Sequence, residues 1–187
     1  MRIKYNAPVV LTFTLLCAFI MFLSQTFIPN LNLYWFMVAG KGSFNAGSFR
    51  NWVTLFTHIM GHANWTHLIS NFTLILLIGP MLEELYGSTD LLIMIIITAI
   101  VTGVLNVLLF KSALLGASGV VFMMILLSSF TNFSKGEIPL TFILVLILYM
   151  GVQIIDSFSS DNISQFAHII GGLCGSFFGF LRPEKRR

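Results

Sequence analysis

The sequence predicts an all-α membrane protein that forms one compact domain over residues 1–187. Hydrophobic residues make up 57% of the chain and charged residues only 9%, with a mean hydropathy of +0.92. Such a chain is far more apolar than a soluble globular domain. Several apolar runs also approach the length of about 20 residues that is needed to cross roughly 30 Å of hydrocarbon. Little sequence is left over for a soluble domain.

The apolar runs predict six membrane-spanning helices. The first run follows Arg2 and Lys4 and is too long for the core of a cleaved signal peptide. A polar and aromatic segment over about 29–57 comes next, and its glycines predict an interfacial loop without a regular helix. The predicted spans are about 9–28, 68–86, 91–110, 118–133, 138–155 and 164–181.

The fourth run is expected to form a short helix. If that helix begins at Ser118, its roughly 16 residues at 1.5 Å each are short for a bilayer. The connector before it, 111–117, is itself mostly apolar, and it can enter the membrane where other parts of the protein shield it. The Ser118 hydroxyl is therefore predicted to lie below the outer surface of the membrane.

The charged residues predict the orientation of the chain in the cell membrane. With the N-terminus inside, the cations of the outer loops are only Lys41, Arg50 and Lys111, and the others fall on the inner side. The positive-inside rule then places both termini in the cytoplasm. The net charge of +3 arises at the chain ends, which is typical of an oriented membrane protein and not of a nucleic-acid-binding surface. Cys17 and Cys174 lie inside apolar runs, which argues against a disulfide framework.

Polar side chains inside apolar runs are candidates for chemistry, because such groups are costly in a membrane. They are His67, Asn71, Asn106, His168 and the pair Glu83-Glu84, and the Ser118 hydroxyl joins them. Ser118 belongs to the sequence Gly116-Ala117-Ser118-Gly119, and His168 lies about one turn into the sixth run, at a similar predicted depth. Gly171 and Gly175 form a small-residue face beside His168 that permits close approach of another helix. Histidine is a base that can activate a serine. Taken alone, each of these residues is more often structural.

Together these motifs resemble the rhomboid family of intramembrane serine proteases. The resemblance rests on Gly116-Ala117-Ser118-Gly119, on Ala167-His168 followed by Gly171 and Gly175, and on His67-Leu68-Ile69-Ser70-Asn71. It covers the chain from about 51 to 179. Each motif alone is weak, but their order on the second, fourth and sixth predicted spans is specific. Glu83 resembles the family's structural acid at the inner end of the second span, and an ordinary interfacial carboxylate is the alternative.

The resemblance implies a six-transmembrane-helix rhomboid bundle with a short central fourth helix. It also implies a dyad without an acidic third member, in which Ser118 attacks a peptide carbonyl and His168 takes the serine proton. By similarity to the family, His67, Asn71 and the Ser118 N–H would stabilise the oxyanion. The implied partners are transmembrane protein substrates within the lipid bilayer. No cofactor and no metal is implied, and the sequence leaves the oligomeric state open.

Three residues are expected to support the dyad. Gly116 and Gly171 would let the substrate backbone and the sixth helix approach the Ser118 hydroxyl. Phe122 lies one turn after Ser118, where many members of the family place a tyrosine packed on the catalytic imidazole, and phenylalanine keeps the stacking surface. Further candidates to line a polar cavity around the dyad are Ser70 and Asn106.

Two alternative functions remain open. The first is a non-catalytic rhomboid-fold binder of membrane helices, although such proteins lack the serine or the histidine and this chain has both. The second is a metal-dependent membrane protein that uses His58 and His62, which are spaced i, i+4. A zincin would have the pattern His-Glu-x-x-His, and the sequence from His58 to His62 contains no glutamate.

Overall fold

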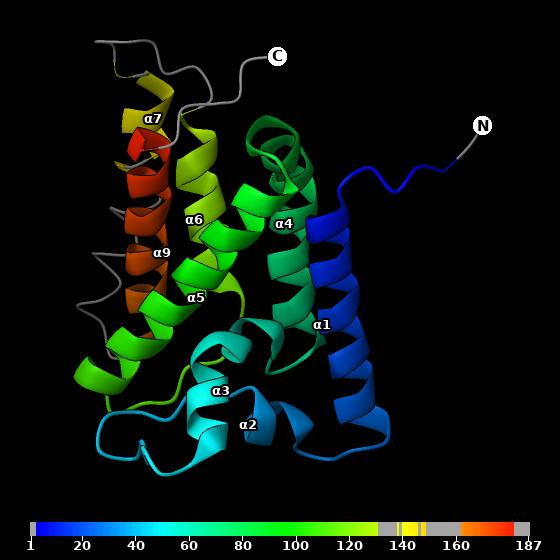
Figure 1. The fold of residues 1–187 in the computed structure, drawn as a ribbon, viewed down its shortest axis with the longest axis vertical. Coiled ribbons are helices and arrows are strands. Elements are labelled where there is room, and N and C mark those ends of the chain that lie inside the picture. The colour runs from blue at the N-terminus through cyan, green and yellow to red at the C-terminus, as the bar shows by residue number, and fades with distance from the viewer. Residues whose placement is uncertain (1–2, 131–137, 139, 146, 149–161, 182–187) are drawn as a thin grey trace.

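Helices form the computed structural model of this 187-residue chain, which describes residues 3–130, 138, 140–145, 147–148 and 162–181. Helix α1, Pro8–Thr26, lies beside α4, Trp65–Tyr86, and α6, Ser118–Ser128, packs along α9, Asn162–Leu181 (Figure 1). Helix α5, Ser88–Leu109, crosses the molecule at a steep tilt. Within the described residues no strand occurs, so the all-α prediction is confirmed there.

Three helices among the described residues are long and apolar enough to cross a membrane, namely α1, α4 and α5. Helices α6 and α9 are apolar as well, but their apolar segments Ser118–Ser128 and Gln165–Leu181 are shorter. Half of the predicted fifth span, 138–155, lies outside the described residues, and α7, Leu140–Val145, is a described helix within it. The count of six spans therefore stays a prediction.

The segment 29–57 contains two short helices, where the sequence predicted a loop without a regular helix. Helix α2 covers Leu31–Trp35, and α3 covers Phe49–Thr57. The glycines separate these helices and do not abolish them, because α3 is amphipathic and buries one face, including Thr54 and Leu55. A 3-10 turn, η1, follows at His58–Met60.

A buried carboxylate holds the first turn of α1. The backbone N–H groups of Val9 and Val10 donate to the two oxygens of Glu83 at 2.9 and 3.0 Å, and the Ser88 hydroxyl donates to the same carboxylate at 2.7 Å. The first N–H groups of a helix have no partner within the helix, and a negative charge at this end is favourable. The geometry therefore favours the structural reading of Glu83, which joins the ends of α1, α4 and α5.

Helix α6 is eleven residues long and is buried continuously from Gly119 to Leu127. A helix that is apolar on all sides needs neighbours on all sides, and α4, α5 and α9 each pack against it. The segment that leads into α6 is held by the segment between α2 and α3, because Val38 and Leu114 form an isolated antiparallel bridge. Residues 131–137, which complete the predicted fourth run, lie outside the described residues.

Candidate active site

Helices α6 and α9 meet at their backbones. An added Cβ at Gly171 would collide with the carbonyl of Gly119, and one at Gly175 would collide with the carbonyl of Met123. A Cβ added at Gly179, one turn further along α9, would collide with the ring of Phe130, in the turn that follows α6. Glycine permits this approach because it carries no side chain, and close backbone contact stabilises helix pairs in membranes.

This crossing brings the neighbourhoods of Ser118 and His168 together. Ser118 is the first residue of α6, and His168 lies in α9 directly after Ala167. A Cβ added to Gly119 would lie only 3.2 Å from the carbonyl oxygen of Ala167. The residue after Ser118 therefore lies against the residue before His168. The side chains of Ser118 and His168 themselves are half-buried.

The imidazole of His168 is stacked on a phenyl ring of α6. The ring centroids of Phe122 and His168 are 4.3 Å apart, and the two ring planes differ by 8°. Phe122 lies one helical turn after Ser118 and therefore on the same face of α6. The stack restricts the orientation of the imidazole beside the start of the helix.

The loop before Ser118 is held tightly against His67. Gly116 has a φ of +126°, a backbone conformation that favours glycine, and its N–H donates to the carbonyl of His58 at 3.0 Å. A Cβ at this position would lie 2.6 Å from Cε1 and 2.8 Å from Nε2 of His67. The loop, α4 and α9 thus converge around the first turn of α6.

Asn71 lies one turn after His67 on α4 and is 6% exposed. Its side-chain nitrogen is buried and has no hydrogen-bond partner among the described residues. A buried donor without a partner costs free energy, and such groups in native proteins call for an explanation. Asn71 therefore has free donor capacity close to the ring of His67.

Residues 50–185 match the family model of the rhomboid domain. The chain belongs to the rhomboid family. It is 33% identical over 145 residues to YdcA of Bacillus subtilis, which is also named for this family, and the match covers 72% of this chain and 69% of YdcA. It is 24% identical over 134 residues to the rhomboid protease GlpG of Haemophilus influenzae, with 70% of each chain covered. The rhomboid-like protein 11, chloroplastic, of Arabidopsis thaliana is 26% identical over 157 residues, covering 80% of this chain and 53% of that protein.

Family membership and apolar helices of spanning length make this rhomboid a multi-pass membrane protein.

Of the further cavity candidates, Asn106 is buried and its side-chain nitrogen donates to the carbonyl of Ser112 at 3.0 Å. Asn106 thereby holds the connector that leads to Ser118. Ser70 is exposed, and its hydroxyl donates back to the carbonyl of Thr66 on its own helix at 2.9 Å. The structure thus ties Asn106 to the connector before Ser118, and the assignment of either residue to a cavity around the dyad stays a prediction.

His58 in this rhomboid is engaged in hydrogen bonds within the bundle. Its Nδ1 lies 3.1 Å from the carbonyl oxygen of Leu55, and its Nε2 lies 3.3 Å from the hydroxyl of Thr102 on α5. Burial lowers the pKa of His58 to about 4, so the ring is neutral near neutral pH. The sequence reasoning missed Thr102, whose signal is a polar side chain inside an apolar span.

His62 makes an edge-on contact with His67, with ring centroids 5.1 Å apart. Burial, and next the nearby His67, lower the pKa of His62 to about 4. Both ring nitrogens of His58 already have neighbours at hydrogen-bond distance, which disfavours the reading of His58 and His62 as a chelating pair. In the described part of the chain, no group of three or more His, Cys, Asp or Glu side chains is placed to hold a metal ion.

Proposed function

We propose that this rhomboid is an intramembrane serine protease, with Ser118 as nucleophile and His168 as general base. The observation that carries the proposal is the glycine crossing of α6 and α9. It places the start of α6 beside the α9 turn that bears His168, whose ring is stacked on Phe122. A relative named as a rhomboid protease supports the reaction class. The substrates are transmembrane segments of other membrane proteins.

The first half of the reaction transfers the acyl group to the enzyme. The Ser118 oxygen attacks the scissile carbonyl carbon while His168 accepts the hydroxyl proton. The resulting tetrahedral intermediate collapses as the carbon–nitrogen bond breaks, and His168 returns the proton to the departing amine. An ester between Ser118 and the N-terminal part of the substrate remains.

The second half of the reaction consumes one water molecule. His168 takes a proton from this water, the hydroxyl attacks the ester carbonyl, and the proton returns to the Ser118 oxygen as the carboxylic acid leaves. Water has to reach the first turn of α6 through a polar cavity open to the outer face of the membrane. Buried polar groups near this turn, including those of Asn71 and Asn106, support such a cavity.

Three donors are proposed to stabilise the oxyanion, namely the side chains of His67 and Asn71 and the backbone N–H of Ser118. The Ser118 N–H belongs to the first turn of α6, where backbone donors have no partner within the helix and the helix dipole favours negative charge. Asn71 supplies a buried amide nitrogen without another partner among the described residues. The His67 ring lies against Gly116, two residues before the nucleophile.

The proposed topology has six spans, a short central fourth helix and both termini in the cytoplasm. Figure 1 supports it, because the start of α1 and the end of α9 lie at the same end of the bundle, as an even number of crossings requires. Substrate helices are proposed to enter from the side. Helix-breaking residues near the cut would help, because they expose the backbone carbonyl to attack.

Cleavage of a transmembrane reporter by the purified protein tests the proposal. Ser118→Ala and His168→Ala are each expected to abolish cleavage. The matched control Ser128→Ala is expected to retain it, because Ser128 lies at the opposite end of α6 and its hydroxyl donates to the carbonyl of Ile125. A fluorophosphonate should label the wild type and not Ser118→Ala. Undiminished cleavage by both dyad variants would refute the dyad, and a wild type that is neither labelled nor active would support the non-catalytic binder.

A further inference from the structure

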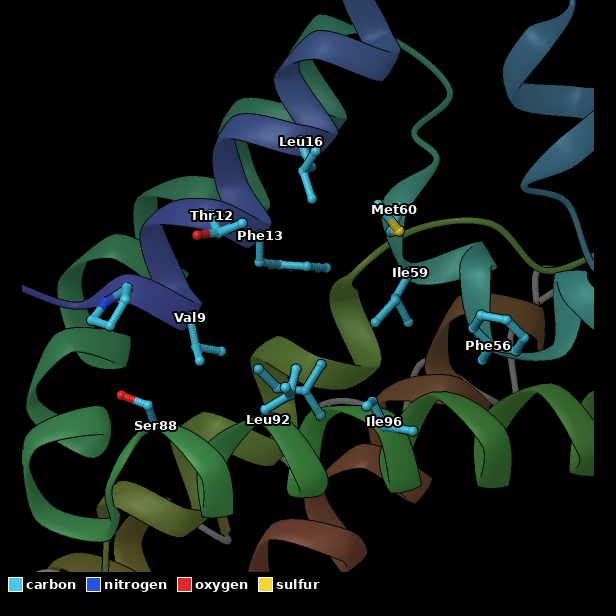
Figure 2. A pocket seen from close by; sticks show the side chains of 12 residues that line it. Val9, Thr12, Phe13, Leu16, Phe56, Ile59, Met60, Ser88, Leu92 and Ile96 are labelled. Carbon is cyan, nitrogen blue, oxygen red and sulfur yellow. The ribbon is translucent and has the colours of Figure 1, made fainter. Parts of the chain in front are cut away.

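A second site lies between two membrane-spanning helices, away from the chemistry proposed above. An apolar groove of about 430 Å³ separates α1 from α5. Figure 2 shows side chains from both helices pointing into this space, with Met60 of η1 at one end and Ser88 at the other. The apolar residues that line it include Val9, Phe13, Leu16, Ile59, Leu92 and Ile96.

The groove is open to the medium that surrounds the helices. Leu16 and Leu92 are each 44% exposed and Ile96 is 42% exposed, so protein does not cover this wall. Both α1 and α5 have the length and composition of membrane spans. An empty apolar space loses dispersion contacts along its whole lining. In a bilayer, the material that fills such a space is an acyl chain.

The end of the groove at the start of α1 continues into a polar cavity of about 460 Å³. The two spaces share Pro8 and Ser88 as lining residues. The polar cavity is also lined by Lys4, Glu83 and Glu84, which together carry one positive and two negative formal charges. An apolar groove that ends among charges of both signs matches a phospholipid whose head group also carries both signs, namely an ammonium and a phosphate.

We propose that this composite site binds one phospholipid of the ethanolamine type. Its acyl chain lies between α1 and α5, its ammonium faces the carboxylates, and its phosphate faces Lys4. The stretch from Pro8 to Leu16 rises by about 12 Å along α1, which gives the apolar part the depth of a substantial section of an acyl chain. Binding of the lipid does not depend on the proposed hydrolysis, so the two proposals can be tested separately.

The groove also adjoins the backbone that supports the candidate active site. Ile59 and Met60, which line it, belong to η1, and the carbonyl of His58 in the same turn accepts the Gly116 N–H at 3.0 Å. A bound acyl chain would therefore pack behind the segment that holds the loop before Ser118. Lipid occupancy is expected to stabilise this segment against unfolding.

Native mass spectrometry of the full chain tests the proposal with an equimolar mixture of phosphatidylethanolamine and phosphatidylglycerol. We expect the wild type to retain one phosphatidylethanolamine in preference. Leu92→Trp fills the groove from its exposed wall and should lower retention about fivefold or more, because dispersion contacts dominate in this medium. The matched control is Leu77→Trp on α4, where Leu77 is 74% exposed and does not line the groove, and it should retain the lipid.

The head-group part of the proposal has its own variant. Glu84→Gln removes one carboxylate from the polar cavity and should reduce the preference for phosphatidylethanolamine over phosphatidylglycerol. Equal retention of the two lipids by the wild type would overturn the head-group assignment. Undiminished lipid retention by both Leu92→Trp and a second variant, Ile96→Trp, would overturn the groove, provided that thermal unfolding shows both variants to be folded.

Discussion

The α6–α9 pair and the α1–α5 pair bring helices together by opposite means. On α9, Gly171 and Gly175 leave out side chains, so backbone meets backbone. In the α1–α5 pair, large side chains such as Phe13 and Leu92 lie between the two helices around a groove of about 430 Å³. Because helix association in lipid depends on packing and not on the hydrophobic effect, the first arrangement fixes the two backbones tightly, whereas the second leaves a space that protein does not fill.

The largest expected effect comes from filling the glycine crossing. Gly171→Val places a branched side chain where a Cβ already collides with the Gly119 carbonyl, so α9 must move away from α6. A shift of about 1 Å at a catalytic pair can cost about 100-fold in rate. We expect kcat for reporter cleavage to fall by about this factor while membrane insertion is unchanged.

The control for this substitution is Leu173→Val, which introduces the same side chain on an exposed position of α9. It should leave kcat within about twofold of the wild type, because exposed surface substitutions usually cost little. Equal loss of activity in both variants would contradict the prediction, because the effect of valine would then not depend on whether the residue faces α6 or the outside of the bundle.

The next effect concerns how α1 is attached. Since the groove leaves α1 loosely packed on α5, the carboxylate of Glu83 should carry much of the attachment. Glu83→Gln keeps the shape of the side chain but replaces one acceptor by an NH2 donor that faces a backbone N–H of Val9 or Val10. We expect a loss of about 3 kcal/mol in the free energy of unfolding, since hydrogen bonds to a buried charge are lost. Thermal unfolding in detergent measures it, with the exposed Glu84→Gln as control.

The pH dependence of stability tests the role of η1, the turn that lies between the α6–α9 crossing and the α1–α5 groove. Burial lowers the pKa of His58 to about 4 from its usual 6.5, so below pH 6.5 the unfolded chain takes up a proton that the folded protein does not. Stability from this group is complete above pH 6.5 and is lost as the pH falls towards 4. Between pH 7 and pH 5 the loss is about 2 kcal/mol, and His62 acts in the same direction.

The midpoint of thermal unfolding at pH 7, 6 and 5 measures this dependence. His58→Gln places a neutral amide in the same space and should make the stability less sensitive to pH than in the wild type. Parallel curves for the two proteins would show that His58 is not the group that titrates.

The sequence was informative about the spans because their apolar runs are local signals. The run predicted at 68–86 corresponds to α4 at Trp65–Tyr86, and the earlier start reflects the Asn64 side chain, which accepts the His67 N–H at 2.8 Å as an N-cap. Helix α3 escaped prediction because neighbouring glycines outweighed its short amphipathic pattern. Packing against the bundle stabilises such a helix, and this packing is not encoded locally.

The candidate site was partly readable for a similar reason. Ser118, His67 and His168 stood out as polar groups in motifs or apolar runs, and the structure gathers their surroundings at the start of α6. The partner of His58, in contrast, is Thr102, which is 44 residues away. The i, i+4 spacing of His58 and His62 carried no information about such a distant contact, and it suggested metal binding instead.

The smallest effect tests how precisely the α6–α9 crossing must position the imidazole. Phe122→Leu keeps the site apolar but removes the ring stacked on His168 at 4.3 Å. Such aromatic pairs contribute about 0.5–1.5 kcal/mol beyond burial, so we expect kcat to fall about fivefold with little change in KM. Phe122→Tyr keeps the stacking surface and should remain within about twofold of the wild type. If leucine supports the same kcat as tyrosine, the backbone crossing alone positions His168, and the contrast between the two helix pairs depends on the glycines without help from the stack.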